Sequence, residues 1–300
     1  MSAPQWILAH GESLQVSLFF GLLLVLAAIE PLVPRRPGPM DRGARWPTNL
    51  LFTLLNVLAL GVLPVSIVST AFWAEQHRWG LLNQVALPTA VLVVVTLAVR
   101  GFISFFTHYL MHMVPLFWRL HRVHHLDTAL DVTTTVRFHP LEFVVQTLPA
   151  VPIVVVFGLT PWVLVFYEIL DVTVTLWTHS NTRLPAALDR VCRYVVVTPD
   201  LHRIHHSAWK PETNSNYGAV FPVWDLVFGT FRSTSRDGHA RMRLGLDGVR
   251  GRAAQRPLWL LGSIFTDRLT RTTASAIVEE GMPSESTPGM NPPQVLGARQ

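Results

Sequence analysis

Two short strings nearly repeat each other at distant places in this chain. Residues 121–125 read HRVHH and residues 202–206 read HRIHH. Each string places histidines at positions i, i+3 and i+4, which share one face of a helix. His108 and His112 add an i, i+4 pair shortly before the first string, so eight of the 13 histidines lie in three strings. This pattern predicts a metal centre built from imidazoles.

The number of histidines favours two metal ions over one. A catalytic zinc ion takes three ligands from the protein, so eight histidines exceed the needs of one ion. Two more lie where apolar segments meet polar ones, although the sequence Phe-His-Pro at 138–140 also suits a structural corner. The single cysteine, Cys192, leaves nitrogen and oxygen as the expected ligands. The predicted metal ligands are His108, His112, His121, His124, His125, His139, His179, His202, His205 and His206.

Acidic and amide side chains near these strings are expected to accept the remaining ring N–H of the ligating histidines and so fix their tautomers. The residues with this expected role are Asp127, Asp131, Glu142, Asn181, Asp200, Asn216 and Asp225. No catalytic side chain is expected apart from the metal ligands. His10, His77 and His239 stand outside the strings and are expected to be ordinary.

The composition points to a membrane protein. Half of the residues are hydrophobic and 14% are charged, against about 25% in a typical soluble domain. The net charge of +5 comes from arginines beside apolar runs, as membrane topology would place them, and no nucleic-acid groove is indicated. The predicted apolar segments are Leu18–Val33, Leu50–Trp73, Val85–Phe106, Phe143–Leu159 and Trp162–Trp177.

The positive-inside rule assigns a side to the histidines. The loop from Arg35 to Arg45 carries four arginines and is expected to be cytoplasmic. If successive apolar segments cross the membrane in alternating directions, every histidine string lies at the cytoplasmic face. We therefore predict an all-α integral-membrane bundle with four to five membrane segments and a cytoplasmic, histidine-rich helical cap that holds a dimetal site.

Several local features refine this prediction. The third segment is expected to run unbroken into the helix of His108, and residues 158–161 to form a tight turn. Leu184–Val197 is predicted to be an amphipathic helix in the interface, and Thr198 to cap the helix of the second string. Glu168 and Asp171 lie within an apolar segment. A functional role and a shallow or tilted segment are both open for them.

The sequence divides into four predicted regions. Residues 1–94 are expected to be membrane segments, 95–235 the catalytic domain, 236–274 a cytoplasmic segment and 275–300 a disordered tail rich in Ser, Pro, Glu and Gly.

These motifs resemble the fatty acid hydroxylase/sterol desaturase superfamily of integral-membrane non-haem di-iron enzymes. The resemblance covers residues 95–232 and includes HxxxH at 108–112, HRVHH, TPDLHRIHH at 198–206, Asn216-Tyr217-Gly218, and Trp224-Asp225 with Phe228-Gly229-Thr230. It implies two iron ions, with zinc possible in purified material. It also implies O₂, reducing equivalents and hydroxylation or desaturation of a lipid, such as a sterol or fatty acyl chain, in lipid biosynthesis.

Two departures from the family pattern matter. Some members carry a further histidine four residues after the one matching His179, but position 183 here is Arg183. No fused cytochrome b5-like domain is expected, because residues 1–90 are mostly apolar segments. The electrons are therefore expected from a separate donor: a ferredoxin, a flavoprotein or a cytochrome b5-like protein.

The alternative hypothesis is a membrane metal-binding protein for transport or sensing, without oxygenase activity. Transport favours ionisable groups strung along a path through the membrane, whereas these histidines are predicted to gather at one face. A haem protein would need single opposed histidines, and a zinc hydrolase motif HExxH does not occur in the sequence. An O₂-dependent lipid oxidoreductase is the favoured prediction.

Overall fold

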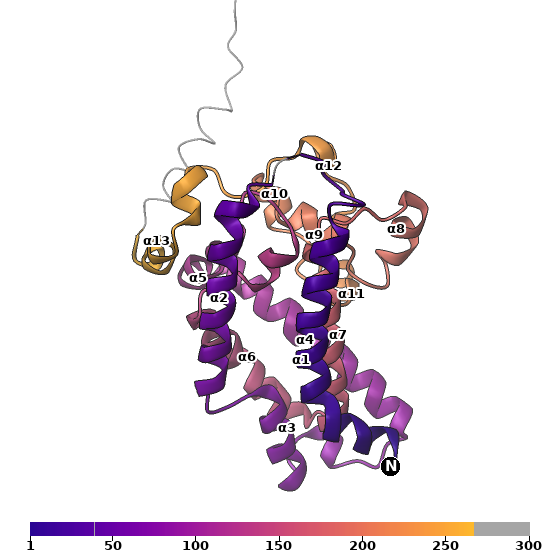
Figure 1. Cartoon of the computed structure of the whole chain (residues 1–300). Helices are drawn as coiled ribbons and strands as arrows, with labels where there is room; N and C mark the ends of the chain where they lie inside the picture. Colours follow the sequence, from indigo (N-terminus) through magenta and orange to yellow (C-terminus); the bar gives the residue numbers. More distant parts are fainter. Residues whose placement is uncertain (39, 267–300) are drawn as a thin grey trace, which may run out of the picture.

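A computed structural model describes residues 1–38 and 40–266 of the chain. Within these residues the protein is helical and has no β-strand (Figure 1). Long helices lie side by side in one half of the molecule, and most of the short helices gather at the opposite end. The predicted all-α bundle is thus confirmed, and its short-helix end is where the histidine strings lie.

Four helical segments are long and apolar enough to cross a membrane. They are α1 (Ala3–Ile29), the segment Arg42–Asn83, α4 (Thr89–Met113) and α7 (Pro161–His179). The fourth predicted segment is the shorter helix α6 (Leu141–Phe157). Since about 20 apolar residues span a bilayer core of about 30 Å, the expected four to five membrane segments are confirmed by length and composition.

The second predicted segment is not one helix, which corrects the sequence-based expectation. Helix α2 (Arg42–Val62) ends at Leu63, and α3 (Ile67–Gln76) begins after Ser66, whose hydroxyl accepts the amide of Ser69. Pro64 lies in the break and cannot continue a helix, because it lacks an N–H.

The remaining elements are short and connect or cap the long helices. They are η1 (Leu81–Asn83), α5 (Pro115–His125), η2 (Val132–Val136), α8 (Ala186–Cys192), α9 (Pro199–His205), α10 (Lys210–Thr213), α11 (Val223–Phe228), α12 (Gly238–Arg241), η3 (Gly251–Gln255), α13 (Pro257–Gly262) and η4 (Ser263–Phe265). The helix expected over Leu184–Val197 is only the seven residues of α8. The predicted cap is present: the Thr198 hydroxyl accepts the amide of Leu201 at 3.3 Å.

The predicted turn between α6 and α7 requires a glycine. Gly158 ends α6 in the left-handed region, with φ of 64°, which glycine adopts without steric cost. Its backbone also packs against Gly80, where a Cβ atom would lie 2.2 Å from the Gly158 nitrogen. This close approach packs the α3–α4 connection against the turn, at the end of the bundle away from the histidines.

Two ionisable side chains inside the bundle pair with each other. Arg100 of α4 donates from Nε to Glu168 of α7 at 2.8 Å, and its guanidinium lies 4.6 Å from the ring centre of Tyr167. Both helices also carry histidines of the predicted site, His108 and His179. The largely buried pair therefore fixes the two helices relative to each other, about two turns before His108 and about three turns before His179.

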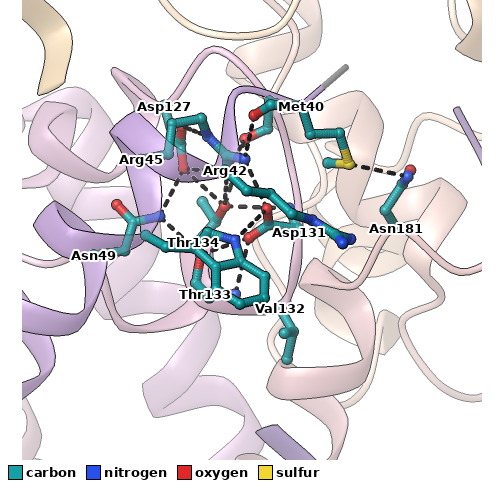
Figure 2. Close-up of polar contacts among 12 residues, drawn as sticks. Met40, Arg42, Arg45, Asn49, Asp127, Asp131, Val132, Thr133, Thr134 and Asn181 are labelled. Carbon is teal, nitrogen blue, oxygen red and sulfur yellow. Dashed lines mark hydrogen bonds and ion pairs between the residues drawn. The ribbon is translucent and has the colours of Figure 1, made fainter. Parts of the chain in front are cut away.

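A second ion-pair network holds the segment that follows the first histidine string (Figure 2). Arg45 of α2 donates to both carboxylate oxygens of Asp127, at 2.5 and 2.7 Å, and to Asp131 at 2.7 Å. Burial alone would raise the pKa of Asp127, but the Arg45 guanidinium lowers it to about 2. Removing one partner of such a buried pair typically costs about 3–5 kcal/mol. The network thus fixes the loop directly after His125.

Residues beyond the second string pack back onto the first. Arg122, between His121 and His124, donates to the carbonyls of Ser263 and Thr266. Arg137 donates to the carbonyl of Val123 and to Gln255. The segment 251–266 is therefore part of the support of the first string. The tail predicted for 275–300 lies outside the described residues.

Candidate metal centre

Nine histidines gather in two buried groups, each with its ring nitrogens within 4.8 Å of one another. Cluster A consists of His108, His112, His121, His125 and His205. Cluster B consists of His124, His179, His202 and His206. The clusters adjoin, since the rings of His125 and His206 are 4.7 Å apart between centres.

Each of the two repeated strings serves both clusters. In α5, His121 and His125 point to cluster A, and His124 points to cluster B. At α9 the partition is reversed, because His202 and His206 join cluster B and His205 joins cluster A. The i, i+4 pair of a string thus goes to one cluster and its i+3 residue to the other. A string with three histidines can therefore bridge two adjacent sites.

The spacing of the ring nitrogens fits metal coordination. Nε2 of His121 lies 3.0 Å from Nε2 of His108 and 3.2 Å from that of His125. In cluster B, the corresponding distances from His179 are 3.1 Å to His124 and 3.0 Å to His202. Two nitrogens bound to one ion at about 2.1 Å lie roughly 3.0–3.4 Å apart at right or tetrahedral angles. The nitrogens thus converge as ligands of a common ion would.

Cluster A also contains buried nitrogens without a protein partner. Nε2 of His112 and Nε2 of His205 make no hydrogen bond, although neither atom contacts solvent. Their other ring nitrogens are occupied, His112 by Asn214 Oδ1 at 3.2 Å and His205 by the carbonyl of Ser215 at 2.7 Å. An unpaired buried acceptor is costly, and a bound cation would satisfy both.

Hydrogen bonds from behind orient the rings of cluster A. His108 Nδ1 pairs with the carbonyl of Tyr217 at 2.8 Å, and His121 Nδ1 pairs with Glu142 at 2.7 Å. Because the carbonyl and carboxylate accept, Nδ1 carries the proton and Nε2 is left as the ligand atom. Glu142 is one of the carboxylates expected to have this role.

Cluster B is less well supported from behind. His179 Nδ1 donates to the carbonyl of Thr175, one turn earlier in α7, at 2.7 Å. Nδ1 of His124 and Nδ1 of His202 have no hydrogen-bond partner. The ring of His124 instead stacks on Phe138, with 4.4 Å between ring centres. Packing rather than hydrogen bonding holds this ring.

Five histidines of the two strings are neutral in the folded protein. Burial, and then the neighbouring imidazoles, lower their pKa well below the ordinary value. These five are His124, His125, His202, His205 and His206. A neutral imidazole has a free lone pair, which is the form that binds a metal.

His139, the tenth predicted ligand, is not in either cluster. It lies at the corner before α6, where its Nδ1 accepts the amide of Leu141 at 3.2 Å. His139 thus lies in a structural corner, which the sequence Phe-His-Pro also suits, because Pro140 and Leu141 begin the next helix directly.

Most of the other expected hydrogen-bonding residues lie one contact further from the rings. Asp127 and Asp131 bind Arg45, Asp200 binds Arg35, and Asn181 accepts from Arg203. These side chains hold the segments on which the histidines lie. These side chains were predicted because they are close to the histidines in the sequence, but in the structure their oxygens bind arginines and not imidazoles.

Asn216 and Asp225 act through the backbone. Asp225 accepts the amides of Tyr217 and Gly218, both at 2.8 Å. Asn216, with φ of 55°, donates to the carbonyl of Leu201 and accepts the amide of Arg232. Together they fix the segment whose carbonyls receive His108 and His205. Asn214, which contacts His112, was not predicted from the sequence, and a backbone carbonyl has no signal there.

Residues 93–230 match the fatty acid hydroxylase family. The chain contains a fatty acid hydroxylase domain. This domain includes all nine clustered histidines and Glu142, and the predicted superfamily is confirmed. The supporting segment 251–266 lies beyond it.

Curated relatives belong to the same superfamily. Ornithine lipid hydroxylase OlsE of Rhizobium tropici is 28% identical over 83% of this chain and 74% of its own length. Human alkylglycerol monooxygenase is 26% identical over 42% of this chain and 27% of its own length. The rice very-long-chain aldehyde decarbonylase GL1-6 is 28% identical over 73% of this chain and 33% of its own length. The chain thus spans about a quarter to a third of the last two proteins. No solved structure matches it.

Proposed function

We propose that this protein is an integral-membrane, O₂-dependent lipid hydroxylase with two iron ions, one in each histidine cluster. The observation that carries the proposal is the convergence of nine imidazoles, eight of them buried, on two adjacent points. The fatty acid hydroxylase domain and the hydroxylases and monooxygenases among its relatives support the reaction type.

The proposed ligands are the five histidines of cluster A and the four of cluster B. Bound iron would supply the reduction of O₂ that oxidises a C–H bond. Overall, RH, O₂, two electrons and two protons give ROH and water. The protein orients the imidazoles through Glu142 and the carbonyls of Ser215 and Tyr217. It also excludes water from rings that are almost entirely buried.

The remaining proposals concern the surroundings of the site. We propose that the clusters face the cytoplasm, because the arginine-rich loop after α1 is at the same end of the molecule. The electrons would come from a separate ferredoxin, flavoprotein or cytochrome b5-like donor. The catalytic domain would extend over residues 95–235. Transport or sensing is not favoured, since the histidines form two compact groups at one end of the bundle.

The test combines metal content with product analysis. Protein purified anaerobically from iron-supplemented cells should contain two iron ions per chain, with nitrogen ligation in Mössbauer spectra. Cells that express it under ¹⁸O₂ should contain a lipid that is heavier by one ¹⁸O atom. Cells that express the His125→Ala variant should lack this lipid. A product lighter by two hydrogens would indicate desaturation. Two zinc ions that iron cannot replace, with no oxidised lipid, would contradict the proposal.

A further inference from the structure

A cavity of about 350 Å³ lies beside the histidine clusters, at the end of α1. Its walls include Glu30, Arg36, Met40, Arg42 and Asn181. Asn181 follows the cluster B residue His179 by two positions, so the chain separates the two by about 7 Å at most. None of the cavity residues belongs to either cluster, and the proposed chemistry does not use them.

Two arginines at this end of the molecule are neutralised by carboxylates. Arg35 donates to Asp200 at 2.6 Å, and Arg42 donates to Glu30 at 2.9 Å. Glu30 is fully buried and also accepts the amides of Val132 and Asn181. Both carboxylates are therefore hydrogen-bonded to partners other than Arg36.

Two other arginines have no carboxylate partner in the described part of the chain. Arg36, on the cavity wall, donates Nη1 to the carbonyl of Met242 at 3.0 Å. Arg203 is fully buried, and its Nε and Nη1 have no hydrogen-bond partner. Asn181 joins the two, because its Oδ1 accepts from the Arg36 amide at 3.1 Å and from Arg203 Nη2 at 3.2 Å. One guanidinium without a carboxylate partner, that of Arg36, thus lies on the cavity wall, and the buried Arg203 lies behind the wall residue Asn181.

A partly buried guanidinium such as that of Arg36 is costly unless a counter-charge is supplied. Phosphate and carboxylate oxygens supply this charge and match the planar geometry of arginine. The cavity also lies just beyond a candidate membrane helix, at the level where lipid headgroups begin. Its volume falls at the lower end of the range of small-ligand sites, about 300–1,000 Å³.

We propose that this cavity binds the anionic oxygen group, phosphate or carboxylate, of a lipid headgroup. The inference rests on the proposed lipid hydroxylase function and deepens it, because it names an anionic lipid as the substrate class. A headgroup held beside Asn181 places the adjoining carbons of the lipid next to cluster B. The oxidised position is then close to the headgroup rather than at the far end of an acyl chain.

The test measures lipid binding to the full-length, metal-loaded protein in detergent. Dioleoylphosphatidic acid is compared with dioleoylglycerol, which is the same lipid without the phosphate. The phosphate should strengthen binding at least about tenfold, and Arg36→Gln should remove roughly ten- to a hundredfold of affinity for phosphatidic acid only. Arg36→Lys should retain part of it. The exposed Arg190, changed to Gln, is the matched control and should bind like the wild type.

Metal content and dioleoylglycerol binding of each variant show whether it has folded. Equal affinity of the wild type for the two lipids, or unchanged phosphatidic acid binding in a folded Arg36→Gln variant, would overturn the proposal. Inorganic phosphate that binds as tightly as phosphatidic acid would assign the cavity to a soluble anion and reject the headgroup. Failure of the hydroxylase proposal would be seen separately, as absence of iron or of an oxidised lipid.

Discussion

Clusters A and B are built from the same kinds of residue but differ in number and support. Cluster A has five histidines and cluster B has four. The difference arises from the long helices, because α4 contributes both His108 and His112 and α7 contributes only His179. Helix α4 continues for one turn past its first histidine, whereas α7 ends at its histidine. The end of a helix thus decides how many ligands each cluster receives.

The residue four positions after His179 could not take part even with a different side chain. Helix α7 ends at His179, and Ser180 turns the backbone to an extended conformation with ψ of 151°. The amide of Arg183 then donates to the carbonyl of Val33 at 2.9 Å, and its side chain is exposed. Position 183 is therefore held away from cluster B by the loop after α1.

The largest expected effect comes from removing one ligand of each cluster. His125→Ala should affect cluster A and His206→Ala cluster B, and each should lower activity by more than about a hundredfold, since changes merely behind the ligands cost 10–100-fold. Each variant should lose about one metal ion per chain, measured by elemental analysis. Loss of both ions from either variant would show that the clusters do not bind independently.

Acidification of the metal-free protein should destabilise it strongly. The pKa of five string histidines is lowered by burial, so the unfolded chain binds more protons as the pH falls below about 6.5. Above that pH, the contribution of these neutral histidines to the free energy of unfolding is fully present. As the pH falls further, this contribution is lost by up to about 1.4 kcal/mol per histidine and pH unit. Unfolding of apo protein between pH 8 and 5 measures this, and a flat profile would contradict neutral buried rings.

Glu142→Gln tests the difference in support. Glu142 accepts from His121 of cluster A, whereas no carboxylate contacts a ring of cluster B in the described residues. The substitution should lower the affinity for the metal ion of cluster A by about 10–100-fold and leave the affinity for the ion of cluster B unchanged. A two-phase titration with a chelator distinguishes the two ions. The control is Glu12→Gln, an exposed change on α1 far along the chain, which should leave both phases unchanged.

Arg183→His should have the smallest effect. Because position 183 points away from cluster B, the new imidazole should add no ligand, and metal content and activity should stay within about twofold of the wild type. A gain in affinity of the cluster B metal would show that the segment after α7 can refold into a further helical turn.

The pattern of histidines and apolar runs was enough to predict the class of the site and of the fold. Histidines at i, i+3 and i+4 can only act together on a helix, and long apolar runs require a membrane or a large core. These local rules predicted the helices, nine of the clustered residues and the cap at Thr198. They also predicted one further ligand, His139, whose place depends on the direction of the chain at a corner.

Tertiary structure alone decided how the histidines are shared between two clusters and what holds them. The split of each string depends on how the histidines of α5 and α9 meet, since His125 contacts both His205 and His206 although they lie far apart in the sequence. The acceptors behind the rings are largely backbone carbonyls, such as those of Ser215 and Tyr217. Two of the nearby carboxylates, Asp127 and Asp131, bind the buried Arg45 instead, because an unpaired buried guanidinium costs more than an imidazole N–H without an acceptor.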